Sequence, residues 1–138
     1  MNRFFFIAGC IAALLAVALG AFAAHGLAEM LVVERLEVFR TGVTYQFYHA
    51  FALIITALVA YVLPQRWVNI SGWLFLGGIV FFSGSLYVLA LREWIGFPVD
   101  WIGPITPIGG LFFICGWGVL AWAAFPEKQT NNEIGEEG

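Results

Sequence analysis

The sequence predicts an all-α protein in which four antiparallel helices cross a membrane and pack as an up-down four-helix bundle. Hydrophobic residues make up 62% of the 138 residues and charged residues only 11%, whereas a soluble domain has roughly 25% charged residues. The apolar residues gather into four runs, each long enough to cross the hydrocarbon core of a bilayer as a helix. So few charges cannot cover a water-facing surface, so we expect the lipid bilayer to be the main partner of this chain.

The first predicted span covers residues 4–24 and holds no charged residue, so as a helix it extends about 31 Å. Arg3, the apolar run and the small residues at 21–23 also fit a signal peptide with its cleavage site. A row of small residues at four-residue spacing favours a retained span, because it lets a second helix approach closely. This row consists of Ala8, Ala12, Ala16, Gly20 and Ala24.

The segment 27–42 mixes charged and apolar residues and has two interpretations. Its apolar residues Val32, Leu36 and Phe39 share one face of a helix. A short helix lying at the membrane interface has this pattern. A helical extension of the second span has it as well, and the sequence leaves both open.

Three further spans are predicted at about 43–63, 70–91 and 103–125, with prolines closing the second and the fourth. Tryptophans flank the connections between spans, as indoles do at the membrane boundary, and Trp117 alone lies well inside a span. We therefore expect one transmembrane domain over residues 1–125. The acidic segment 126–138 is predicted to be a disordered tail.

Four spans place both termini on the same side of the membrane. Basic residues are equally frequent on the two sides, with Arg3, Arg66 and Lys128 facing three arginines, so the positive-inside rule does not decide the orientation. The free amino group beside Arg3 favours cytoplasmic termini.

Polar side chains concentrate in the half of the predicted bundle that adjoins the 1–2 and 3–4 connections. Such side chains are costly in hydrocarbon and commonly line functional sites. They also occur as hydrogen-bonding partners between helices, and His25 has the further interpretation of a helix-end residue at the interface. The candidate ligand-binding residues are His25, Tyr45, Gln46, His49, Ser83, Ser85, Tyr87 and Thr106.

Glycines recur along the predicted spans at spacings that align them on helix faces. Small residues of this kind let helix backbones approach closely. The candidate packing residues are Gly20, Gly77, Gly84, Gly109 and Gly116.

Several classes of function have no support in the sequence. A basic patch for nucleic acid is absent, and Cys10 and Cys115 show no metal-ligand spacing. The spans contain neither a pair of carboxylates nor a nucleophile motif. We therefore expect no catalytic residue, no metal and no cofactor.

Several motifs resemble the YgdD-like small inner-membrane proteins, a bacterial domain-of-unknown-function family with eukaryotic relatives. The matching stretches are 20–27 (GAFAAHGL), 41–49 (TGVTYQFYH), 82–87 (FSGSLY) and 103–110 (GPITPIGG) with Gly116-Trp117. Ala23 stands where Gly is expected and Gly42 where Ala is usual. The resemblance implies a multi-pass protein of the bacterial inner membrane with four spans, and it implies no reaction.

Two functions fit these observations. The chain could bind or pass a small polar ligand, an ion or a lipid headgroup at a pocket on the loop side, an activity that in so small a protein calls for a homo-oligomer. Alternatively, its glycine faces could pack against a larger membrane complex as an assembly subunit.

Overall fold

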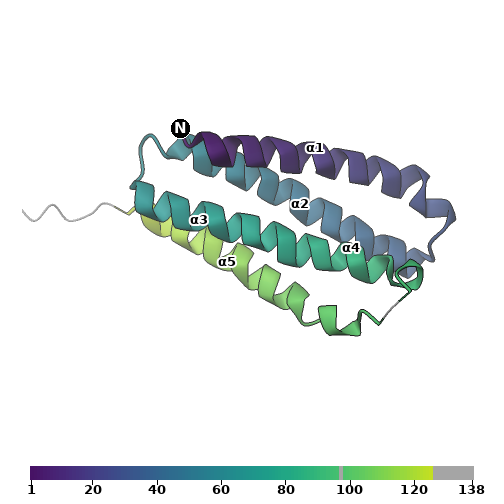
Figure 1. Ribbon diagram of the computed structural model, residues 1–138. Coiled ribbons are helices and arrows are strands. Elements are labelled where there is room, and N and C mark those ends of the chain that lie inside the picture. The colour runs from purple at the N-terminus through teal and green to yellow at the C-terminus, as the bar shows by residue number, and fades with distance from the viewer. Residues whose placement is uncertain (97, 126–138) are drawn as a thin grey trace, which may run out of the picture.

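Four long helices form the part of the chain that the computed structural model describes, residues 1–96 and 98–125 (Figure 1). Each of the four is long and apolar enough to cross a membrane, and the described residues contain no strand. The predicted tail at 126–138 lies outside the described residues. The principal elements are α1 (Arg3–His25), α2 (Val33–Val59), α3 (Gln65–Gly78) with α4 (Gly84–Ala90), and α5 (Ile105–Ala123).

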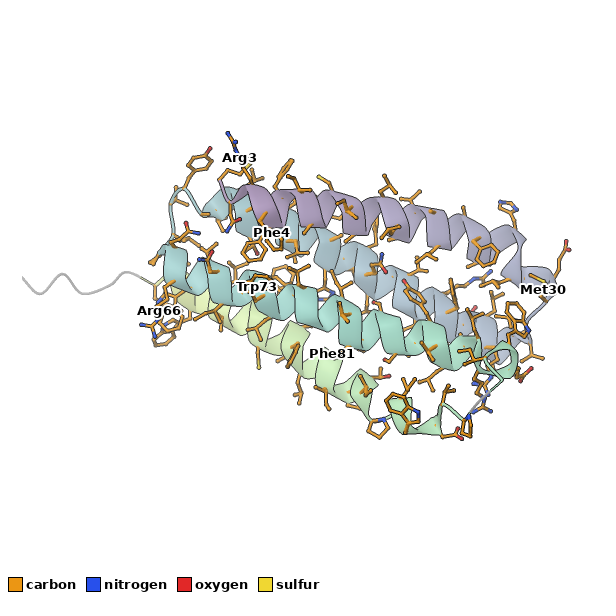
Figure 2. The ribbon with its side chains drawn as sticks, in the orientation of Figure 1. Arg3, Phe4, Met30, Arg66, Trp73 and Phe81 are labelled. Carbon is orange, nitrogen blue, oxygen red and sulfur yellow. The ribbon has the colours of Figure 1, made fainter. Side chains whose placement is uncertain are left out.

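The helices alternate in direction, and Figure 1 shows α2 and the α3–α4 helix lying between α1 and α5. The closest backbone packing joins α1 to α2 and α3 to α5. Figure 2 shows Arg3 and Arg66 at one end of the bundle and Met30 at the other, as an antiparallel arrangement requires. The all-α four-helix membrane bundle predicted from the sequence is thus confirmed.

Asn2 fixes the beginning of α1 to the neighbouring helices. Its side-chain oxygen accepts a hydrogen bond from the backbone N–H of Phe5 at 3.3 Å, which caps the helix. Its backbone N–H donates to the carbonyl of Ala57 at 3.0 Å, and its side-chain amide donates to Asn69 Oδ1 at 3.1 Å. Further along, Gly9, Ala12 and Ala16 are buried. A Cβ added at Gly9 would lie 2.8 Å from the Ala50 carbonyl oxygen, so α1 and α2 pack nearly backbone to backbone.

The segment 27–42 extends the second helix and does not form a separate interfacial helix. After a 3₁₀ turn at Leu27–Glu29, α2 begins at Val33, ten positions before the predicted start of the span at 43. Leu36 and Phe39 are buried in a cluster with Ala23, Leu27 and Ala90. Their apolar side chains therefore pack against neighbouring helices instead of entering the membrane interface.

One charged side chain ties this extension to a neighbouring helix. Arg35 donates a hydrogen bond to the carbonyl of Leu89 at 3.2 Å, near the end of α4, where carbonyls lack helical partners. Arg40 and Glu37 form an exposed ion pair at 2.9 Å within the helix. At its other end α2 stops at Val59, before the predicted end at 63, and Pro64 immediately precedes the first residue of α3.

The third crossing contains a π-helical turn at Ile79–Ser83, between α3 and α4, which the sequence did not predict. α5 comes closest to the third crossing at this turn. A Cβ added at Gly109 would collide with the backbone nitrogen of Phe82, and a Cβ added at Gly78 would collide with the ring of Phe113. Pro104 immediately precedes α5 and Pro107 lies in its first turn, where a missing amide hydrogen is tolerated.

Candidate functional site

A cleft opens between α2 and α5, whose backbones are not closely packed against one another. Its volume is about 410 Å³, within the range of small-molecule sites. The third crossing contributes Phe82 to its wall. We call this space the lateral cleft; its lining residues are Tyr45, His49, Phe82, Gly110, Phe113, Ile114 and Trp117.

The lateral cleft lies near the middle of the bundle and not at the loop side. His49 is 16 residues from the beginning of α2, about 24 Å along the axis. Phe113 is about 12 Å from the beginning of α5 and about 15 Å from its end. His49 lies this far along the helix because α2 begins at Val33, ten positions before the predicted start of the span.

His49 is buried and bonded on both ring nitrogens. Nδ1 lies 2.7 Å from the carbonyl oxygen of Tyr45, which can only accept, so Nδ1 carries the proton. Nε2 accepts a hydrogen bond from the indole N–H of Trp117 at 3.3 Å. The ring stacks on Phe113, with 3.4 Å between centroids and planes 7° apart. In this tautomer His49 links α2 to α5 and has no lone pair left for a metal ion.

Gln46 and Tyr87 form a second polar link, between three helices. The Gln46 amide donates to the carbonyl of Ala12 in α1 at 2.9 Å. The Tyr87 hydroxyl, from α4, donates to the Gln46 side-chain oxygen at 2.8 Å. Both polar ends of the Gln46 side chain are therefore used in holding helices together.

Ser85 and Thr106 form a third link, close to the loop end. The two hydroxyl oxygens are 2.6 Å apart, and Ser85 donates to the Phe82 carbonyl in the π-helical turn at 2.9 Å. This contact ties the beginning of α5 to the third crossing. Together the three links use five of the predicted ligand-binding side chains in contacts between helices.

The remaining three predicted residues, His25, Ser83 and Tyr45, do not take part in these links. His25 is exposed at the end of α1. Ser83 is fully buried, and its hydroxyl has no hydrogen-bond partner among the described residues. Tyr45 lines the lateral cleft, where it is half-exposed and packs on the ring of Phe82.

The predicted packing glycines are used mostly within the chain. A Cβ at Gly77 would lie 2.7 Å from Phe112, one at Gly116 would lie 2.7 Å from Phe75, and Gly109 meets the π-helical turn. At Gly20 an added Cβ would meet Val43 at 3.4 Å. Gly84 differs from the expectation, because an added Cβ there meets nothing within 4 Å.

Sequence reasoning missed the aromatic wall of the cleft, formed by Phe82, Phe113 and Trp117. Phenylalanines are common throughout this chain and carry no signal of their own. Trp117 did stand out as the one tryptophan deep inside a span, and its bond to His49 accounts for that position. Among the described residues no group of three or more potential metal ligands occurs.

Comparison with known proteins places the chain in a family. Residues 19–110 match the family model described as "Protein of unknown function (DUF423)". The chain belongs to this family.

Bacterial relatives of similar length agree with this assignment. A UPF0382 membrane protein of Staphylococcus aureus (strain bovine RF122 / ET3-1) is 43% identical over 123 residues, which cover 89% of this chain and 96% of the relative. The UPF0382 membrane protein YwdK of Bacillus subtilis (strain 168) is 45% identical and covers 88% of this chain and 96% of its own. A UPF0382 membrane protein of Haemophilus influenzae is 43% identical, with 81% and 86% covered. No solved structure matches.

The family members are named as membrane proteins with no assigned activity. Together with the four apolar helices, these names support a small multi-pass bacterial membrane protein. The family description assigns no reaction.

Proposed function

We propose that this protein binds an uncharged, membrane-soluble molecule in the lateral cleft. The observation that carries the proposal is the cleft itself, which lies near the middle of the bundle and has an aromatic lining. Side chains usually fill the space between packed helices. At Gly110 the cleft wall has no side chain to fill it.

An uncharged ligand fits better than the polar ligand, ion or lipid headgroup expected from the sequence. Of the eight residues behind those expectations, Gln46, Ser85, Tyr87 and Thr106 have polar atoms that bond to one another or to helix backbones. No Asp, Glu, Lys or Arg lines the cleft within the described part of the chain. A charged group at this depth would cost several kcal/mol without a partner.

The cleft is open on the side that faces lipid. Ile114 is 69% exposed, Trp117 44% and Tyr45 40%, and all three line it. Because the exposed surface of these helices faces acyl chains when the bundle lies in a bilayer, a ligand dissolved in the membrane can enter sideways. Passage across the membrane is not needed for this binding.

Gly110 offers a way to block the cleft without disturbing the fold. A Cβ there would lie 3.7 Å from Phe82, which is ordinary contact, so Gly110→Leu fills the cleft. Gly118→Leu is the matched control, since Gly118 is on the same helix, is exposed, and has open space around an added Cβ.

The test compares the lipids extracted from wild type, Gly110→Leu and Gly118→Leu after mild purification from bacterial membranes. We expect one apolar species to be enriched over the bulk membrane extract in wild type and Gly118→Leu, and lost in Gly110→Leu. Three extracts of the same composition as the bulk membrane would refute the proposal.

The alternative role as an assembly subunit is less well supported, because it depended on glycine faces that are open to another protein. Gly77, Gly109 and Gly116 lie against aromatic residues or backbone of the same chain, so these glycines offer no open face to another protein. The resemblance to YgdD-like proteins adds no activity to either role.

We also propose that the termini lie in the cytoplasm, on the side of Arg3 and Arg66 (Figure 2). A carboxyl-terminal fusion to alkaline phosphatase, which is active only outside the cytoplasm, should then be inactive. An active fusion would show that the termini lie outside the cytoplasm.

A further inference from the structure

Deepening the proposed function on which it rests, we propose that the lateral cleft takes an isoprenoid quinone. Such a molecule has an uncharged planar ring, two carbonyl acceptors and an apolar tail. Three properties of the cleft favour this class over an acyl chain or a phospholipid headgroup: the geometry of its rings, its one unpaired donor, and its depth and lack of charge.

Three of the rings that line the cleft present nearly parallel faces, whereas Phe82 and Trp117 are tilted by 41° to 58° against them. The plane of His49 lies 7° from that of Phe113 and 17° from that of Tyr45, and the planes of Tyr45 and Phe113 differ by 24°. Aromatic rings favour offset stacking on other flat rings. A planar head group can therefore continue this stack, whereas a flexible acyl chain gains only the burial of its surface.

Among the described residues, all but one of the polar side chains that line the cleft already form hydrogen bonds within the protein. Both nitrogens of His49 are bonded, and the indole N–H of Trp117 donates to His49. Tyr45 lines the same space and is half-exposed, and its hydroxyl makes no hydrogen bond within the described residues. A quinone carbonyl supplies the acceptor that this hydroxyl lacks, and a saturated chain does not.

The depth and the absence of charge also match this ligand. The wall residue Phe113 is near the middle of α5, about 12 Å from one end and about 15 Å from the other. A phosphate-bearing headgroup at this depth would be buried without a cationic partner. A quinone ring is uncharged and soluble in hydrocarbon, and its tail can leave the cleft past the exposed side chain of Ile114.

The test uses purified full-length protein in nanodiscs of a synthetic phosphatidylcholine that contain no quinone. Decylubiquinone is titrated, and quenching of tryptophan fluorescence is recorded, because Trp117 lines the cleft. In Gly110→Leu the cleft is filled, so the remaining quenching comes from quinone that is dissolved in the bilayer. Gly118→Leu controls for a leucine added to the same helix.

We expect saturable quenching for wild type and Gly118→Leu, and only the linear component for Gly110→Leu. Tyr45→Phe removes one hydrogen bond and no ring, so the dissociation constant should rise about 2- to 10-fold. Because this hydroxyl has no hydrogen-bond partner within the described residues, Tyr45→Phe should fold as wild type does, and its result does not depend on the fate of Gly110→Leu.

Decane, which matches the tail of decylubiquinone without its ring, separates failure of this inference from failure of the proposed function. If an equal concentration of decane halves the saturable quenching by decylubiquinone, or if Tyr45→Phe binds as tightly as wild type, the quinone assignment is wrong. The cleft then remains a site for apolar chains. If quinone shows no saturable quenching while the extracts of wild type and Gly110→Leu still differ, the assignment is again wrong. If the extracts of wild type and Gly110→Leu also have the same composition, both the quinone assignment and the proposed binding of an apolar molecule are wrong.

Discussion

At the scale of single residues, the polar side chains of this protein divide by what they contact. Gln46 bonds to α1 and to α4, and His49 bonds to α5, so each fixes the position of neighbouring helices. The Tyr45 hydroxyl lies beside the cleft and has no hydrogen-bond partner among residues 1–96 and 98–125. The sequence placed all three in one candidate site, but their separate roles depend on rotamers and partners that only the folded structure defines.

Replacement of Gln46 by Leu should destabilise the bundle. The change keeps similar volume but removes both interhelical hydrogen bonds, each worth on average about 0.6 kcal/mol in membrane proteins. It also leaves the Tyr87 hydroxyl without its acceptor. We expect the free energy of unfolding in mixed micelles to fall by about 1–2 kcal/mol. A stability equal to that of wild type would contradict the role given to Gln46.

Replacement of Ser83, in contrast to that of Gln46, should not destabilise the bundle. Its hydroxyl is fully buried and has no partner within the described residues, so it contributes no hydrogen bond that a substitution can remove. Ser83→Ala should change the free energy of unfolding by less than about 0.5 kcal/mol or raise it. The same unfolding assay checks this, and a loss like that of Gln46→Leu would show that Ser83 has a polar contact after all.

At the scale of elements, the π-helical turn at Ile79–Ser83 and α5 are fitted to one another. π-helical turns often mark functional sites, and Phe82, which lies within this turn, lines the lateral cleft. Gly109 lets the α5 backbone approach the turn, and the Ser85–Thr106 contact holds the helices together nearer the loop end. The turn therefore helps to position Phe82 in the wall of the cleft.

Gly109→Ala should destabilise the protein by about 1–3 kcal/mol, because the added Cβ would collide with backbone atoms that cannot rotate aside. Gly84→Ala is the control: it adds a Cβ in open space within a helix, so it should be neutral or raise stability by up to about 1 kcal/mol. The unfolding free energies of the two variants can be compared directly. Equal effects would show that the close approach at Gly109 is not required.

At the scale of the whole molecule, composition and apolar run length were enough to predict the membrane bundle. Helix boundaries were harder to predict, since the charged residues among 33–42 fit both an interfacial helix and an extension of the second span, and only the structure shows that they belong to α2. The cleft could not be predicted, because it depends on α2 and α5 staying apart while both pack on the third crossing.

The central claim is that the lateral cleft retains one kind of molecule, distinct from bulk lipid. Its most direct measurement is photo-crosslinking in bacterial membranes from a photoreactive amino acid at Ile114, which lines the cleft, compared with Leu111, which is exposed on the same helix outside it. We predict one discrete adduct mass at position 114, absent at 111 and abolished by Gly110→Leu. The same broad mixture of lipid adducts at both positions, unchanged by Gly110→Leu, would contradict the claim.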